Sequence, residues 1–234
     1  MAKYAKRLTS IKPFRVVEML EDAKKLERLG HRIVHFEVGE PDFETASPIV
    51  EAAHRGLDAG VTKYTQALGI PALRARIARY YAETTGVSVD AGRIVITSGA
   101  SGGLMLACAA LLDPDTELLL TDPGYPCNEA FVNVVGARPV RIPVLPVDGF
   151  QLRADAIRAH WGERARGLLL GSPANPTGVV TPRRELLDIL SAVRDNQGFV
   201  VLDEIYQGLV YTDTPEYLTG LQLDDDVIVI NSFS

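Results

Sequence analysis

No run of about 18 or more apolar residues, the length a transmembrane helix needs, occurs in the 234-residue sequence. The N-terminal stretch MAKYAKRLTS is basic but no apolar segment follows it, so the pattern of a secretory signal peptide is also missing. We therefore expect neither a membrane span nor a leader, and a cytoplasmic location is the default.

Cysteine and histidine are scarce, and they stand apart from one another. Neither the two cysteines nor the four histidines show the short spacing of metal ligands. These residues are Cys108, Cys127, His31, His35, His54 and His160. We expect no metal site, and both cysteines are interpreted as small buried apolar residues.

Clusters of basic residues interleaved with aromatic ones are also missing, and the formal net charge is −6. Nucleic acid is therefore not an expected partner. Because 47% of the residues are hydrophobic and 23% are charged, the chain can form one large or two modest globular domains.

Apolar periodicity and the placing of glycine and proline predict alternating helices and strands. The expected helices span 14–29, 48–59, a segment from Pro71 to Gly86, 104–112, a short segment ending at Val135, 154–160 and 183–195. The expected strands span 32–38, 93–97, 117–121, 138–144, 167–171, 200–202 and 227–230, and residues 211–223 form a polar excursion. This alternation predicts an α/β fold with a doubly wound, mainly parallel sheet.

An acidic pair follows a buried strand in the stretch VVLDEIY, residues 200–206. Ligands of open α/β sheets bind outside the carboxyl ends of the strands, so Asp203 is placed to face a cationic group. An alternative is that Asp203 only caps the next turn, as aspartates after strands often do.

A turn of small residues, SGASGG at 98–103, joins a predicted strand to a predicted helix. Backbone N–H groups in such a turn, helped by the helix dipole and the Ser101 hydroxyl, can bind a phosphate. The turn matches neither the Walker loop nor GxGxxG. Close packing of helix on strand explains the glycines about as well.

Two further loops follow predicted strands. Tyr125, in DPGYP, could stack on a flat ring or fill a gap beside the sheet. Asn175 lies between two prolines in SPANPTG, and proline stiffens the chain on both sides of it. Earlier in the chain, Gly39 leaves its backbone open to a ligand, and Tyr64 could offer a hydroxyl to an anion.

Taken together, the stretches GEPDF, KYT, SGAS, DPGYP, SPANPTG, DEIY and NSFS resemble the class I/II aminotransferases over nearly the whole chain. These are fold-type I enzymes, similar to aspartate aminotransferase, that use pyridoxal 5′-phosphate (PLP). The order SPANPTG then DEIY is the most specific part of the resemblance.

The resemblance implies roles for residues around the PLP ring. Asp203 would pair with the pyridine nitrogen and keep it protonated, which makes the ring an electron sink. Asn175 and Tyr206 would hydrogen-bond the phenolic oxygen of the ring, and Tyr125 would stack on its face. Asp203 and Tyr206 are thus the expected catalytic side chains.

It also implies roles further from the ring. Ala100, Ser101 and Ser232 would bind the phosphate. Tyr64 would reach the phosphate of the neighbouring subunit's cofactor, so the protein would be a homodimer with shared active sites. Gly39 would contact the substrate carboxylate through its backbone, and Asn175 is also an expected substrate contact.

In this family the lysine that forms the Schiff base with PLP follows the NSFS-type motif at once, whereas this sequence ends at Ser234. The chain is either a fragment or is interrupted where a modified lysine stands. It stops one residue short of the expected lysine, which favours the second explanation. Taken literally, it would have no transaminase activity. We expect residues 1–47 to form an N-terminal arm and part of a small domain, and 48–234 an incomplete PLP-binding large domain.

The expected activity is ping-pong transamination between an L-amino acid and a 2-oxo acid. The same fold and cofactor support a carbon–sulfur β-lyase, which is one alternative. Another is a non-catalytic effector-binding domain, as in regulators that fuse a DNA-binding module to such a domain. The short segment before the first helix argues against that. The amino acid itself is not indicated.

Overall fold

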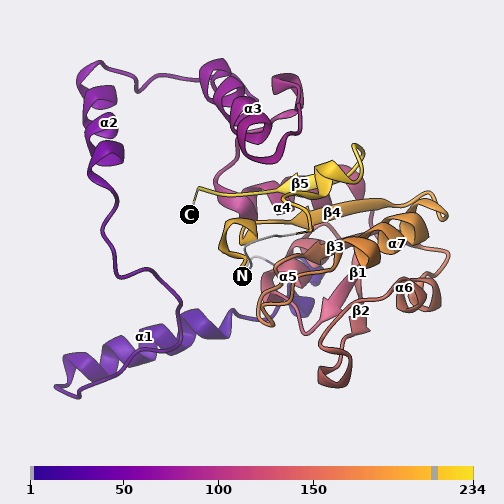
Figure 1. The fold of residues 1–234 in the computed structure, drawn as a ribbon. Helices are drawn as coiled ribbons and strands as arrows, with labels where there is room; N and C mark the ends of the chain where they lie inside the picture. The colour runs from indigo at the N-terminus through magenta and orange to yellow at the C-terminus, as the bar shows by residue number, and fades with distance from the viewer. Residues whose placement is uncertain (1–2, 212–215, 234) are drawn as a thin grey trace. The chain divides into compact units, whose positions relative to one another are not determined.

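The computed structural model describes residues 3–211 and 216–233. The chain divides into two compact units, one formed by residues 1–12 with 71–234 and the other by residues 13–70 (Figure 1).

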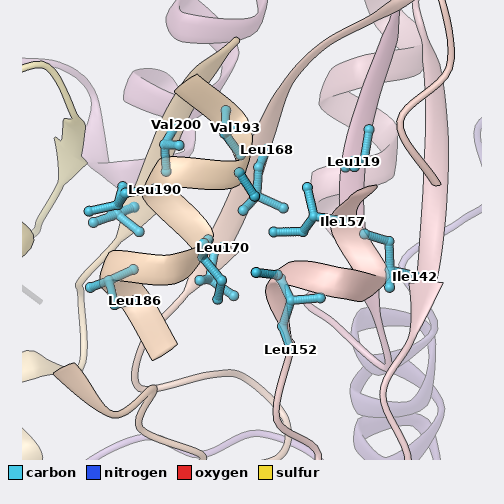
Figure 2. Close-up of a cluster of buried hydrophobic side chains, with 14 of the residues drawn as sticks. Leu119, Ile142, Leu152, Ile157, Leu168, Leu170, Leu186, Leu190, Val193 and Val200 are labelled. Carbon is cyan, nitrogen blue, oxygen red and sulfur yellow. The ribbon is translucent and has the colours of Figure 1, made fainter. Parts of the chain in front are cut away.

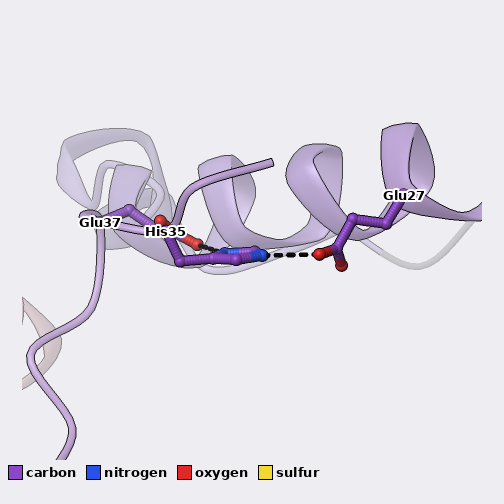
Figure 3. A network of polar contacts seen from close by, with 3 residues as sticks. All are labelled: Glu27, His35 and Glu37. Carbon is purple, nitrogen blue, oxygen red and sulfur yellow. Dashed lines mark hydrogen bonds and ion pairs between the residues drawn. The ribbon is translucent and has the colours of Figure 1, made fainter. Parts of the chain in front are cut away.

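The unit of residues 13–70 contains two helices, α1 (Arg15–Arg28) and α2 (Ser47–Asp58). Helix α1 is followed by Leu29 and Gly30, and the φ of +89° at Gly30 is a left-handed conformation that suits glycine. The imidazole of His35 lies between the carboxylates of Glu27, on α1, and Glu37 (Figure 3). The expected strand at 32–38 is wrong, because no described residue pairs with it and a strand needs a neighbouring strand for its backbone hydrogen bonds.

The larger unit holds the sheet and the other regular elements. Its strands are β1 (Glu117–Asp122), β2 (Arg138–Pro143), β3 (Ala165–Gly171), β4 (Phe199–Asp203) and β5 (Ile228–Ile230). Its α-helices are α3 (Pro71–Thr85), α4 (Gly99–Leu111), α5 (Pro126–Val134), α6 (Ala154–His160) and α7 (Arg183–Arg194). Short 3-10 helices cover Lys6–Ser10, Ala91–Arg93, Pro146–Asp148, Gln207–Leu209 and Gly220–Gln222.

Among the described residues the sheet has five strands in the order β2-β1-β3-β4-β5, and every neighbouring pair is parallel. From β1 the chain passes through α5 to β2 on one side, and then through α6 to β3 on the other side of β1. The direction of winding therefore reverses between β1 and β3. Such a reversal is where open α/β sheets bind their ligands.

Side chains alternate between two apolar cores, one on each face of the sheet. Leu168 and Leu170 of β3 belong to the core under α6 and α7, which Figure 2 shows, and Leu169 belongs to the core under α4 and α5. Helices α6 and α7 contribute residues such as Ile157 and Leu190 to the first core. Covering both faces with helices is what makes the fold doubly wound, as the sequence predicted.

The sequence predicted the strands of the sheet and most of the helices to within about two residues. The expected strand at 93–97 is wrong, because Arg93 ends a 3-10 helix and residues 94–97 pair with no strand in the described part of the chain. Helix α4 begins at Gly99, earlier than the expected start at 104. Trp161, the only tryptophan in the sequence, is half-buried against the core under α6 and α7.

No helix in residues 3–211 and 216–233 is both long and apolar enough to span a membrane.

Candidate active site at the carboxyl edge of the sheet

Four of the predicted residues lie at the carboxyl ends of neighbouring parallel strands or in the loops that follow them. Tyr125 follows β1, Asn175 follows β3, Asp203 ends β4 and Ser232 follows β5. In the ladder, Gly171 stands opposite Asp203, which in turn stands opposite Ile230. The parallel register brings the loops that carry these side chains to one edge of the sheet, beside the reversal between β1 and β3.

The carboxyl group of Asp203 is buried and has little support from the protein. Only 8% of the residue is exposed, and burial raises its pKa. One oxygen accepts a hydrogen bond of 3.3 Å from the backbone N–H of Ile205, so Asp203 does cap the next turn. No lysine, arginine or histidine among the described residues forms an ion pair with it. A buried carboxylate in this state favours a cationic partner.

Asn175 occupies a loop that its own backbone closes. Ala174 N–H donates to Val179 at 2.9 Å and Gly178 N–H donates to Ala174 at 2.7 Å, and the latter turn uses the positive φ of Gly178. The Asn175–Pro176 peptide bond is cis. The amide Nδ2 of Asn175 lies 3.5 Å from the hydroxyl oxygen of Tyr206. Two groups from distant parts of the sequence thus meet at one point of the edge.

Tyr125 lies at the N-terminus of α5 and is half-buried. Burial is the main cause that raises its pKa, followed by the thiol of Cys127 and the nearby Tyr206 and Asp203. Tyr206 and Asp203 are thus electrostatic neighbours of the phenol. Tyr125 can therefore lie against a planar group held by Asp203.

The first turn of α4 supplies the predicted phosphate contacts. Ala100 and Ser101 lie within the helix rather than in a turn before it, which corrects the expected geometry. Their N–H groups belong to the first turn, where donors lack partners within the helix, and the side chain of Ser98 caps none of them. The site is therefore a helix N-terminus with small residues, which suits an oxyanion.

Close packing accounts for the next two glycines. A Cβ at Gly103 would stand 3.2 Å from Cδ1 of Ile230, the last residue of β5, and one at Gly102 would stand 3.4 Å from Cβ of Thr97. Helix α4 thus packs tightly over the end of β5, which brings its first turn towards the loop containing Ser232. The packing interpretation of the SGASGG stretch is thus confirmed for Gly102 and Gly103, and phosphate binding at Ala100 and Ser101 stays a prediction.

Gly39 and Tyr64 do not belong to the unit that contains this edge of the sheet. Both lie in the unit of residues 13–70, where they are exposed and Tyr64 is fully accessible to solvent. Their predicted roles stay predictions.

Glu204 and Tyr217 form buried polar contacts that the sequence did not indicate. Only 2% of Glu204 is exposed; its carboxylate accepts hydrogen bonds from Thr219 Oγ1 at 2.8 Å and Gly220 N–H at 2.6 Å, and burial raises its pKa to about 7. Tyr217 and Thr219 are buried while Leu218 between them is exposed. The sequence contains no signal for this, because the apolar Leu218 is the exposed residue and the polar Thr219 is a buried one, which reverses the usual pattern.

The family model described as aminotransferase class I and II matches residues 31–234. The chain belongs to this family. The family uses PLP. The buried carboxylate of Asp203, which forms no ion pair among the described residues, and the uncapped first turn of α4 fit a cofactor with a cationic ring nitrogen and a phosphate.

Individual aminotransferases are similar to this family member over most of its length. The valine–pyruvate aminotransferase of Mycobacterium tuberculosis is 35% identical over 224 residues, which are 96% of this chain and 58% of that protein. The (5-formylfuran-3-yl)methyl phosphate transaminase of Methanocaldococcus jannaschii is 33% identical over 233 residues, 98% of this chain and 59% of that one.

A solved structure of the Thermus thermophilus aspartate aminotransferase with maleate matches with a TM-score of 0.93 and 30% identity, over 100% of this chain and 61% of that one. The fold is therefore that of the fold-type I aminotransferases. The chain spans about three fifths of the length of these relatives.

Only one of the two cysteines is buried as expected, because Cys127 is half-buried. Cys108 is buried, and burial raises its pKa to about 11, so it is not a reactive thiolate. No three His, Cys, Asp or Glu side chains in the described ranges gather closely enough to hold a metal ion.

Proposed function

We propose that the full-length protein is a PLP-dependent aminotransferase that transfers an amino group from an L-amino acid to a 2-oxo acid by a ping-pong mechanism. The observation that carries the proposal is the buried carboxylate of Asp203, which has no cationic partner among the described residues. Family membership and the names of the similar proteins support it.

When bound, PLP supplies an electron sink for the charge that forms at Cα of the amino acid. In this proposal Asp203 holds a proton on the ring nitrogen, because a carboxylate in a poorly solvated site stabilises an adjacent cation. Tyr125 covers one face of the ring and excludes water from it. Asn175 and Tyr206 donate hydrogen bonds to the phenolic oxygen of the ring and so hold it in its charged form.

The phosphate would be bound by the N–H groups of Ala100 and Ser101 and by the hydroxyl of Ser232. The first turn of α4 adds a partial positive charge there. Binding the phosphate at the helix and the ring nitrogen at Asp203 would fix the cofactor at both ends.

The substrate and subunit contacts belong to the same proposal. Gly39 and Asn175 would contact the substrate carboxylate, and Tyr64 would reach the phosphate bound by a second subunit of a homodimer. The proposed location is the cytoplasm, and the process is amino-acid metabolism, including biosynthesis. The proposed small-domain segment is 1–47 and the PLP-binding domain starts at 48.

The full-length protein tests the proposal directly. After incubation with PLP, the protein should retain a phosphopyridoxyl group on borohydride reduction, which intact mass measures. A panel of L-amino acids should then yield 2-oxo acids only when an acceptor 2-oxo acid is present and without release of ammonia. Ammonia and pyruvate from a cysteine conjugate would instead identify a β-lyase, and no retained cofactor would contradict the proposal altogether.

A further inference from the structure

The hydroxyl of Tyr217 joins the two ends of the loop that carries Asn175. It lies 3.0 Å from Ser172 Oγ and donates to the carbonyl oxygen of Thr181 at 2.9 Å. Only 5% of Tyr217 is exposed, and Ser172 and Thr181 are buried as well. These bonds are shielded from water, so each contributes more than a surface hydrogen bond.

The loop closes on itself at the same place. Thr181 N–H donates to Ser172 Oγ at 3.0 Å, so Ser172, Thr181 and Tyr217 form a closed set of three hydrogen bonds. Ser172 N–H also donates to the Asp203 carbonyl at 3.0 Å. The base of the loop is thereby fixed to the end of β4, while Asn175 lies within the loop.

The segment 217–220 is itself tied to the stretch that carries Tyr206. Gln207 Nε2 donates to the Tyr217 carbonyl oxygen at 3.2 Å. Glu204 accepts hydrogen bonds from Thr219 and Gly220. The segment 217–220 is thus bonded both to the loop that carries Asn175 and to residues 204 and 207, which flank Tyr206.

We propose that Tyr217 is a positioning residue: its hydroxyl holds the 172–181 loop so that the Asn175 amide and the Tyr206 hydroxyl converge on one acceptor. Tyr217 touches neither group itself. The consequence for the cofactor rests on the proposed function, because that acceptor would be the phenolic oxygen of PLP. The fixing of the loop does not rest on it.

The loop itself is tested by amide hydrogen exchange on the cofactor-free, full-length protein. Tyr217→Phe keeps the ring and removes only the hydroxyl. Exchange in a peptide covering 172–181 should become about fivefold faster, the equivalent of one lost hydrogen bond, while a peptide covering β2 stays unchanged. Tyr211→Phe is the matched control, because Tyr211 is 99% exposed.

Equal exchange of the 172–181 peptide in Tyr217→Phe and Tyr211→Phe would overturn the proposal. If Tyr217→Phe fails to fold, Ser172→Ala removes a partner of the same hydroxyl and the comparison is repeated with it. Faster exchange in the loop and in β2 alike would mean general destabilisation and would also count against a positioning role.

The link to Asn175 is tested by a double-mutant cycle read from the absorbance of bound PLP. Loss of the Asn175 amide should raise the pH midpoint of the spectral transition by about 0.7 unit, the equivalent of one hydrogen bond. Tyr217→Phe should raise it by part of that amount, and should add nothing in the Asn175→Ala background. Full additivity would overturn the link.

The two proposals fail differently. If neither the wild type nor any variant binds PLP, the proposed function is wrong. The exchange experiment still decides the role of Tyr217 in that case. If PLP binds and the exchange rates do not respond, the function stands and the positioning role is wrong.

Discussion

Asp203 and Glu204 are adjacent, and both are buried, but the protein satisfies only the second carboxylate. Glu204 accepts two hydrogen bonds, from Thr219 and Gly220, whereas Asp203 accepts one at 3.3 Å from Ile205. Glu204 lies with Leu202 and Gly220 towards the core under α6 and α7. Asp203 is two residues after Val201 on β4 and so shares its face of the sheet, and Val201 belongs to the core under α4 and α5. One carboxylate is therefore part of the fold, and the other is the one that, in the proposed function, pairs with the cofactor.

Replacing Asp203 should separate stability from activity. In Asp203→Asn the buried charge is gone, so the cofactor-free protein should melt at a higher temperature. Transamination should fall by about a hundredfold or more, because an amide does not hold a proton on the ring nitrogen. Thermal unfolding and steady-state turnover of the full-length protein measure the two effects.

Asp122→Asn is the matched control, because Asp122 is exposed at the end of β1 on the same edge. It should change neither quantity appreciably. An Asp203→Asn variant that turns over normally would contradict the role given to Asp203.

Glu204 should make the stability of the cofactor-free protein depend on pH. Its pKa is raised from 4.5 to about 7, so the folded state binds the proton more tightly than the unfolded chain. The stabilisation is fully present below pH 4.5 and is lost as the pH rises through about 7, a change of about 3 kcal/mol in the free energy of unfolding.

Glu204→Gln removes this titration with almost no change in shape. Urea unfolding at about pH 5 and about pH 8 gives the free energy of unfolding of both proteins. Relative to the wild type, the variant should gain about 3 kcal/mol in this free energy at the higher pH. A constant difference between the two would mean that Glu204 does not titrate in this range.

Local sequence patterns predicted the sheet and the loops at its edge because strands, turns and helix ends are specified by residues close together in the chain. DPGYP, SPANPTG and DEIY each combine a strand end with a turn, which is why Tyr125, Asn175 and Asp203 could be named from sequence. Strand pairing is not local. Residues 32–38 and 94–97 have strand-like composition but no partner strand among the residues described.

The support beneath the site was not predictable for the same reason. Tyr217 bonds to Ser172 across 45 residues, and Thr219 bonds to Glu204 across 15. No periodicity encodes such partners. Helix propensity did not indicate that α4 starts at Gly99 either, because it is poor for glycine.

Gly220 should tolerate no side chain. A Cβ there would overlap the Cδ1 atom of Leu202 and stand 3.2 Å from Oε1 of Glu204, so Gly220→Ala should lower the free energy of unfolding by about 1–3 kcal/mol through overpacking. Gly208→Ala is the control, because nothing lies within 4 Å of a Cβ at that exposed position. Equal stability of the two variants in urea unfolding would contradict this packing.

His35 should titrate above its ordinary range within the unit of residues 13–70. Its Nδ1 lies 2.5 Å from Glu37 Oε1 and its Nε2 lies 3.0 Å from Glu27 Oε1 (Figure 3). Hydrogen bonds to Glu37 and then Glu27 raise its pKa above 6.5. The stabilisation from the charged hydrogen bonds of His35 is therefore fully present below pH 6.5. It is lost as the pH rises through the raised pKa of His35.

Nuclear magnetic resonance of the His35 imidazole measures this titration in the whole protein. Glu27→Gln should lower the midpoint, because it replaces one of the two carboxylates with a neutral amide. Glu21→Gln removes a charge from the same helix without touching the imidazole and should change the midpoint much less. If the two variants titrate alike, the contact between Glu27 and His35 does not persist in solution. A wild-type midpoint at 6.5 would mean that neither carboxylate holds the imidazolium.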